Sequence, residues 1–112
     1  MGLTERRCVA CGPGTPPLGE AEAEALLRQV PGWEMEAEGR ALRREFRFDS
    51  YWAGLGFVNA VAWMAQQERH HPDLALGYKT VAVRWTTHAA NGLTENDFIG
   101  AAKAQALFDG PA

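Results

Sequence analysis

The segment from Tyr51 to Glu68 constrains the fold more than any other part of the chain. At helical spacing its apolar residues form one broad stripe, made of Tyr51, Leu55, Val58, Val61, Ala62 and Ala65. Four more large apolar residues fall outside the centre of that stripe: Trp52, Phe57, Trp63 and Met64. A helix that is apolar on more than one side must bury more than one side. We therefore expect one side to pack within the domain and the other against a second subunit.

Local signals mark both ends of this helix. Asp49 or Ser50 can cap its first turn with a side-chain oxygen. At the other end, Pro72 disfavours the α conformation for the residue before it. The helix is therefore expected to end around Arg69 or His70.

A pair of alternating segments lies on each side of the long helix. Before it, residues 33–37 and 40–48 alternate apolar and polar side chains across Glu38-Gly39. Arg44 interrupts the apolar side of the second segment. After the helix, apolar residues alternate at Leu74, Leu76 and Tyr78, and then at Val81, Val83 and Trp85. Period-two alternation across a turn predicts a β-hairpin in each case.

Two shorter helices are predicted at the ends of this pattern. Residues 20–30 have helical apolar spacing and stop at Pro31-Gly32. Asn91-Gly92 predicts a turn, and Thr94-Glu95-Asn96-Asp97 is a capping-box variant with Asp in place of Glu. The last helix is expected to begin there, with Leu93 and Phe98 at the hydrophobic-staple positions. Its apolar residues are Phe98, Ile99, Ala102, Ala106 and Leu107, and it should stop before Gly110-Pro111.

The predicted order is α-β-β-α-β-β-α. This order favours an α+β domain with a four-stranded antiparallel sheet and three helices packed on one face. A length of 112 residues suits one domain, which we place at residues 18–112. Residues 1–17 are rich in Gly and Pro, so we expect a flexible N-terminal arm.

Composition excludes several classes of function. The formal net charge of −3 argues against a nucleic-acid binder with a broad basic surface. The sequence contains no run of about 18 apolar residues, so no membrane span is predicted. Residues 1–7 lack the apolar stretch of a secretory signal, so a cytoplasmic location is expected.

Cys8 and Cys11 are the only cysteines, and their CxxC spacing suits a redox pair or half of a zinc site. No second CxxC follows, and residues 12–17 do not resemble the strand-to-helix turn of thioredoxins. The interpretation we favour is a pair of reduced thiols in the arm. A zinc ion shared across an oligomer remains an alternative.

The three histidines of the chain, His70, His71 and His88, all stand at the ends of predicted elements. The partial negative charge of a helix C-terminus would stabilise an imidazolium at His70 or His71. Asp97, in the first turn of the last helix, could accept a hydrogen bond from one ring and define its tautomer. Such a set suits proton transfer near neutral pH.

Two other interpretations of the histidines stay open. A three-histidine metal site is disfavoured because the adjacent His70 and His71 cannot easily point both rings at one ion, and no HExxH motif is present. Alternatively, the histidines only satisfy turns and strand ends. We therefore expect a catalytic site without a metal.

Four short motifs resemble the pterin-4a-carbinolamine dehydratase family. They are His70-His71-Pro72-Asp73, Tyr78-Lys79-Thr80-Val81, Thr86-Thr87-His88 and Gly92-Leu93-Thr94-Glu95-Asn96-Asp97-Phe98. The resemblance covers roughly residues 18–108, and the paired cysteines are also similar to those of some bacterial members. It implies the fold predicted above, assembly into dimers or tetramers, and no metal or organic cofactor.

The resemblance also implies a hydro-lyase reaction. The family removes water from 4a-hydroxytetrahydrobiopterin to give quinonoid dihydrobiopterin, which recycles the cofactor of aromatic amino-acid hydroxylases. By resemblance, His70 and His88 are candidates for acid–base work, His71 for contact with the pterin, and Asp97 for support. The family often has a glutamate four residues before the first histidine. Here that position is Gln66, and Glu68 is the only acid nearby.

Two alternatives to this function follow from the same resemblance. Some family members act as partners of transcription factors or as assembly chaperones, and degenerate ones lose their histidines. This chain keeps all three, which favours catalysis. A related reaction on another pterin, for example in molybdopterin metabolism, is not separated by the sequence.

Overall fold

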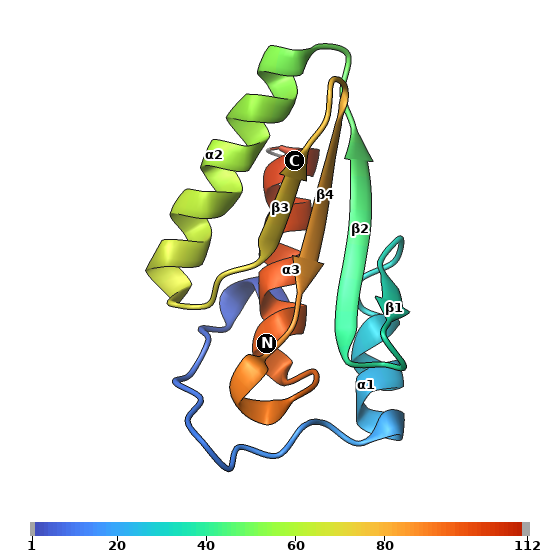
Figure 1. Cartoon of the computed structure of the whole chain (residues 1–112), viewed down its shortest axis with the longest axis vertical. Coiled ribbons are helices and arrows are strands. Elements are labelled where there is room, and N and C mark those ends of the chain that lie inside the picture. Colours follow the sequence, from blue (N-terminus) through green and yellow to red (C-terminus); the bar gives the residue numbers. More distant parts are fainter. Residues whose placement is uncertain (1, 111–112) are drawn as a thin grey trace.

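A computed structural model describes residues 2–110. Its elements are α1 (Glu20–Leu27), β1 (Glu34–Glu36), β2 (Ala41–Arg47), α2 (Tyr51–Glu68), β3 (Asp73–Leu76), β4 (Thr80–Trp85) and α3 (Glu95–Asp109), with 3-10 turns at η1 (Leu3–Glu5) and η2 (His88–Ala90). The predicted order of three helices and four strands is confirmed (Figure 1). Pro111, expected just beyond the last helix, lies outside the described residues.

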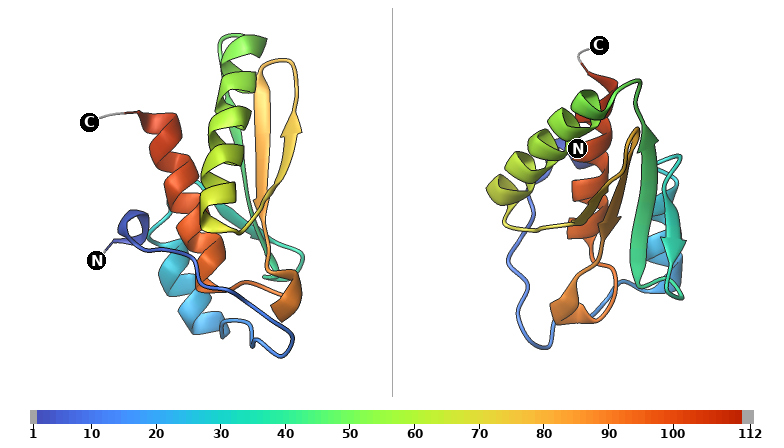
Figure 2. Two further views of the ribbon diagram at one scale, coloured as in Figure 1. Left: turned by 90° about the vertical axis from the view of Figure 1, so that its left-hand side faces the viewer. Right: turned by 45° about the horizontal axis from the view of Figure 1, so that its top comes forward.

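The four strands form one antiparallel sheet in the order β1-β2-β4-β3. The two central strands come from different hairpins, and their register pairs Phe46 with Val81 and Arg44 with Val83. The helices cover one face of the sheet, as predicted (Figure 2). The core lies between these layers, where apolar residues of β2 and β4 are almost completely buried: Leu42, Phe46, Val81, Val83 and Trp85.

Helix α2 has the predicted bounds. The Oγ atom of Ser50 accepts a hydrogen bond from the backbone N–H of Ala53 at 3.1 Å, so Ser50 is the N-cap. The helix ends at Glu68 because Arg69 adopts a left-handed conformation with φ of 55°. That turn is what releases the following histidines from the helix.

The buried side of α2 differs from the predicted stripe. Its buried residues are Gly54, Phe57, Val61, Ala65 and Glu68, so only two members of the predicted stripe are buried. A Cβ atom at Gly54 would lie 3.3 Å from Leu76, which shows how closely the helix approaches the sheet. Trp52 and Trp63 are 76% and 71% exposed. Spacing alone could not choose the inner side because apolar residues occur around much of the helix.

Helix α1 ends at Leu27, three residues before the predicted end at Val30, which is nevertheless buried. Helix α3 begins with the predicted capping box between Thr94 and Asp97. Its apolar side is only partly as predicted. Ala101 and Ala104 are buried, whereas Ala106 and Leu107 are exposed near the end of the helix.

One strand prediction is wrong, and the predicted interruption of β2 at Arg44 is present. Tyr78, expected to continue the third strand, lies in the turn after β3 and is 75% exposed. Arg44 does interrupt the apolar side of β2. Its guanidinium lies 4.8 Å from the centre of the Phe46 ring and donates a hydrogen bond to Gln105 of α3. The positive charge therefore remains at the edge of the core.

Residues 2–17 make more contacts with the domain than their composition suggested. Leu3 is buried in the core, and the Arg6 side chain forms an ion pair with Glu95 at 3.2 Å. The segment then follows the ends of α2 and α3 (Figure 1). In the part of the chain described here, no helix is both long enough and apolar enough to cross a membrane.

Candidate active site

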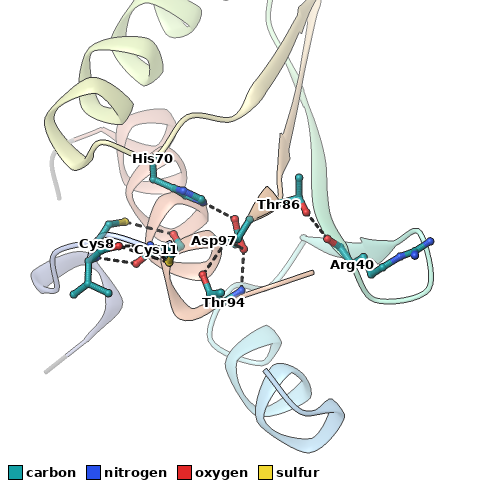
Figure 3. Close-up of polar contacts among 10 residues, drawn as sticks. Cys8, Cys11, Arg40, His70, Thr86, Thr94 and Asp97 are labelled. Atoms are coloured by element: carbon teal, nitrogen blue, oxygen red, sulfur yellow. Dashed lines mark hydrogen bonds and ion pairs between the residues drawn. The ribbon is translucent and has the colours of Figure 1, made fainter. Parts of the chain in front are cut away.

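The ring of His70 points at the carboxylate of Asp97 (Figure 3). The distance from His70 Nε2 to Asp97 Oδ1 is 2.6 Å, and the Asp97 side chain is completely buried. A carboxylate only accepts hydrogen bonds at neutral pH, so Nε2 of His70 carries the proton. Nδ1 then remains as the ring atom that can exchange a proton with a ligand.

The other oxygen of Asp97 is held from two sides. Oδ2 accepts a hydrogen bond from the Thr87 hydroxyl at 2.7 Å and from the Thr94 backbone N–H at 2.9 Å. Because Asp97 is also the third residue of α3, the helix N-terminus favours its negative charge. The same residue therefore caps a helix and orients a histidine.

His70 is also held by ring stacking. Its ring lies 5.6 Å from the Trp85 ring at an angle of 15°. Trp85 in turn packs on Gly100, where a Cβ atom would come within 2.6 Å of the indole. The backbone N–H of His70 donates to the carbonyl of Ala65 at 3.2 Å. Packing and hydrogen bonds together leave His70 little freedom to rotate.

His71 and His88 are more exposed. His71 Nε2 lies 3.0 Å from Oε1 of Gln66, one turn back on α2, so the two side chains orient each other. His88 is the first residue of η2 rather than the end of a strand, and its side chain makes no hydrogen bond with any residue of 2–110. It is therefore free to bond a ligand.

All three histidines line one pocket of about 400 Å³. Its other lining residues include Asp73, Thr86 and Thr87 from the sheet side, and Val9, Cys11 and Asn96 from the opposite side. The predicted convergence of the His70-His71 corner with His88 is therefore present in the structure. Sequence reasoning did not place Val9 and Cys11 at this pocket, since no local pattern brings the arm beside the histidines, and it took Asn96 only as part of the capping motif of the last helix.

Glu68 is not brought to this pocket. Its carboxylate instead accepts hydrogen bonds from Lys103 Nζ at 2.6 Å and from the Cys8 backbone N–H at 2.8 Å, and it pairs with Arg7 at 3.0 Å. Burial alone would raise the pKa of Glu68, but the hydrogen bonds from Lys103 and Cys8 and the charges of Lys103 and Arg7 lower it below its ordinary value. Glu68 thus connects the arm to α2 and α3.

Two further features bear on the chemistry. Among residues 2–110, no group of three or more His, Cys, Asp or Glu side chains is arranged to hold a metal ion. A second cavity, of about 490 Å³, lies between α1 and the turn that joins β1 to β2, and its lining includes no histidine or cysteine. Of these two cavities, the one lined by the histidines offers imidazole groups for acid–base chemistry.

Comparison with known proteins agrees with this site. The family described as pterin 4 alpha carbinolamine dehydratase matches residues 16–107 of the chain. The chain belongs to this family. The resemblance seen in the four sequence motifs is thereby confirmed.

Individual members of the dehydratase family cover most of the chain. A protein of Stenotrophomonas maltophilia strain K279a, provisionally named as a pterin-4-alpha-carbinolamine dehydratase, is 51% identical over 105 residues, which are 94% of this chain and 90% of that protein. A protein of Xanthomonas campestris pv. campestris strain B100 with the same provisional name is 58% identical over 92 residues, 82% of this chain and 78% of its own.

A solved structure of a family relative shares the fold. The crystal structure from Brucella melitensis, described as a transcriptional coactivator/pterin dehydratase, superposes with a TM-score of 0.77. It is 34% identical in sequence and covers 81% of this chain and 97% of its own. The two proteins therefore share their fold over most of this chain.

Proposed function

We propose that this chain dehydrates a pterin-4a-carbinolamine, 4a-hydroxytetrahydrobiopterin, to quinonoid dihydrobiopterin and water. In this reaction the bond from the carbinol carbon to oxygen breaks, and the oxygen leaves as water after gaining a proton. The adjacent nitrogen loses its proton, and a carbon–nitrogen double bond forms. The step requires one group that gives a proton and one that takes a proton, and no change in oxidation state.

The observation that carries this proposal is the pocket shared by all three histidines, in which His70 is oriented by a buried Asp97. His70 can exchange a proton through Nδ1, since Nε2 is bonded to Asp97. His88 enters the same pocket from η2 and has no competing side-chain partner among residues 2–110. We assign the two proton transfers to this pair.

The remaining predicted residues have supporting roles in the proposal. His71 contacts the bound pterin, and its hydrogen bond to Gln66 sets the orientation of its ring. Gln66 supplies an amide where the family often has a carboxylate, so it orients His71 without adding a charge. Asp97 acts through His70 and is a positioning residue.

The direct test uses purified full-length protein and 4a-hydroxytetrahydrobiopterin generated in the assay. The protein should accelerate the decay of this intermediate above its spontaneous rate, without added metal. Equal decay rates with and without protein would remove the enzyme proposal. Activity that EDTA abolishes and zinc restores would contradict the metal-free chemistry.

The wider setting of the reaction is also a proposal. Quinonoid dihydrobiopterin is the form that a reductase would return to tetrahydrobiopterin, so the enzyme would serve an aromatic amino-acid hydroxylase in the cytoplasm. A coupled assay with a tetrahydrobiopterin-dependent hydroxylase should show less carbinolamine accumulation when this protein is present. An unchanged carbinolamine level would contradict a role of this protein in recycling the hydroxylase cofactor.

A second candidate function is protein binding, because the Brucella melitensis relative is described as a coactivator as well as a dehydratase. The retained histidines and their common pocket favour the enzyme. A double variant, His70→Ala with His88→Ala, distinguishes the two functions. It should lose dehydratase activity but retain binding to a protein partner.

A further inference from the structure

The N-terminal arm lies across the end of the histidine pocket, although residues 1–15 precede the part of the chain that matches the family. Its course is set by contacts from Arg7 to Cys11. The Arg7 guanidinium donates a hydrogen bond to the backbone carbonyl of Gln67 at 3.1 Å and pairs with Glu68. These contacts fasten the arm just where α2 ends and the histidine corner begins.

Glu68 is the first attachment point of the arm. Oε1 of Glu68 accepts a hydrogen bond from the Cys8 backbone N–H. Oε2 accepts a hydrogen bond from Lys103 Nζ and forms an ion pair with the Arg7 guanidinium. The Glu68 side chain is only 6% exposed, and that of Lys103 is 15% exposed. A charge-assisted bond in such surroundings is stronger than one at the surface. Glu68 therefore holds the arm to both α2 and α3.

Asn96 is the second attachment point. Its Oδ1 accepts a hydrogen bond from the Val9 backbone N–H at 3.0 Å, and its Nδ2 donates to the Val9 carbonyl at 2.7 Å. Nδ2 also lies 3.4 Å from Sγ of Cys11. One side chain in the first turn of α3 thus satisfies both backbone groups of Val9 and orients the Cys11 thiol.

This double attachment leaves the Val9 side chain 70% exposed at the wall of the histidine pocket. An exposed branched side chain on an immobilised backbone offers a preformed apolar surface. A reduced pterin is a nearly flat heterocycle, and burying such an apolar surface under its ring would contribute to its binding free energy. Cys11 lines the same wall with a thiol that can bond the polar edge of the ring.

We propose that the arm completes the substrate site, with Val9 and Cys11 contacting the pterin and with Glu68 and Asn96 as the positioning residues. The inference rests on the proposed dehydration, because it takes the ligand of the histidine pocket to be a pterin. It assigns contact with the substrate to two residues, Val9 and Cys11, that precede the part of the chain matching the family. It also explains why Glu68 is buried in an ion-pair cluster rather than directed at the histidines.

The first experiment compares Val9→Ser with Ala10→Ser. Ala10 is the next residue of the arm and does not line the histidine pocket, so it is the matched control. Val9→Ser should raise KM for the carbinolamine about fivefold to tenfold, because it removes apolar surface the pterin covers. It should leave kcat within about twofold. Equal KM values for the two variants would overturn the contact with Val9.

Asn96→Ala tests the positioning role. It should raise KM by about tenfold with kcat retained, because the arm loses its bonds to Val9 while the histidines remain. A purely structural role would lower the melting temperature without separating KM from kcat. A change in kcat alone would therefore contradict the assignment.

A second readout does not depend on turnover. In a Cys8→Ala background, Cys11 is the only thiol, and its alkylation by iodoacetamide can be timed with and without 7,8-dihydrobiopterin. Binding of the pterin is measured separately by titration calorimetry. Saturating dihydrobiopterin should slow Cys11 alkylation at least fivefold.

The two proposals fail in different ways in this experiment. Binding of dihydrobiopterin with an unchanged alkylation rate would overturn the role of the arm and leave the dehydratase proposal intact. An absence of any pterin binding, together with no acceleration of carbinolamine decay, would overturn both.

Discussion

A hydrogen bond of 2.6 Å joins Nε2 of His70 to Oδ1 of Asp97, although the two residues lie 27 positions apart in the chain. Asp97 is completely buried, and its second oxygen is occupied by Thr87 and Thr94. Both oxygens of the carboxylate are therefore engaged in hydrogen bonds out of contact with solvent. This relation assigns the proton of His70 to Nε2 and orients the ring.

Replacing Asp97 by asparagine should separate orientation from packing. Asp97→Asn keeps the size of the side chain but can present an amide N–H to His70, which would favour the wrong tautomer. We expect kcat to fall by roughly 10²- to 10⁴-fold, in line with the loss of general acid–base catalysis. Steady-state kinetics on the carbinolamine measure the effect. A kcat near that of the wild type would show that His70 does not need Asp97.

His88 should be needed for turnover but not for stability. Because its side chain is exposed and unbonded within residues 2–110, His88→Ala should change the free energy of unfolding by less than about 0.5 kcal/mol. Turnover should fall roughly 10²- to 10⁴-fold. Urea unfolding and kinetics on the same preparation check both parts. Ala89→Ser, at the adjacent exposed position of the same pocket wall, should keep its rate.

Gly100 should be intolerant of even one methyl group. A Cβ atom there would come within 2.6 Å of Trp85, whose ring stacks on His70. Gly100→Ala should therefore lower the free energy of unfolding by about 1–3 kcal/mol. Gly12→Ala is the control, since no atom lies within 4 Å of the added methyl group. Equal urea midpoints for the two variants would contradict the packing argument.

The exposed tryptophans of α2 should mediate assembly into a homodimer or homotetramer. Trp52 and Trp63 are separated by three helical turns and so lie on the same side of α2. A Trp52→Glu, Trp63→Glu variant should be monomeric in analytical ultracentrifugation, whereas the wild type should not. Tyr78→Glu changes an equally exposed aromatic residue elsewhere and should leave the mass unchanged. A monomeric wild type would refute the expected assembly.

Attachment of the arm should depend on pH through Glu68. Its pKa is lower in the folded protein than its ordinary value of 4.5, so the charged form stabilises the folded state at higher pH. That stabilisation is present above pH 4.5 and is lost as the pH falls through the folded-state pKa. Glu68→Gln should therefore reduce stability at pH 7 and flatten the loss of stability on acidification. Urea unfolding from pH 7 to pH 3 measures both. A parallel pH dependence in the two proteins would exclude Glu68 as the group responsible.

The cysteines of the arm should differ in reactivity. Burial, reinforced by the negative charge of Glu68, raises the pKa of the Cys8 thiol to about 12. Because the thiolate is the reactive form, Cys8 should react slowly with iodoacetamide at pH 8. Cys11 should react faster, and mass spectrometry of each single-cysteine variant measures the two rates. Faster alkylation of Cys8 would contradict its buried environment.

Local chemistry accounts for most of the correct predictions. The bounds of α2 follow from Ser50 at one end and from the turn before Pro72 at the other. The start of α3 follows from the capping box of Thr94 and Asp97. These signals act within a few residues, so the sequence carries them directly.

The error in the buried side of α2 has a physical cause. Phe57 and Val61 face the core, whereas Trp52 and Trp63 face outward, and all four belong to a helix whose apolar residues surround it. Helical spacing limits which residues share a side but cannot say which side meets the sheet. That choice depends on how closely Gly54 lets α2 approach β3 and β4.

The amino-acid sequence by itself determined the order of elements, the capping of the helices and the identity of the histidine motifs, because these depend on neighbours along the chain. Only the tertiary structure decided that His70 is the histidine that Asp97 orients, that Glu68 serves the arm, and that Val9 reaches the pocket wall. Each of these contacts joins residues at least 27 positions apart or combines several segments. Such contacts arise from packing of the whole domain.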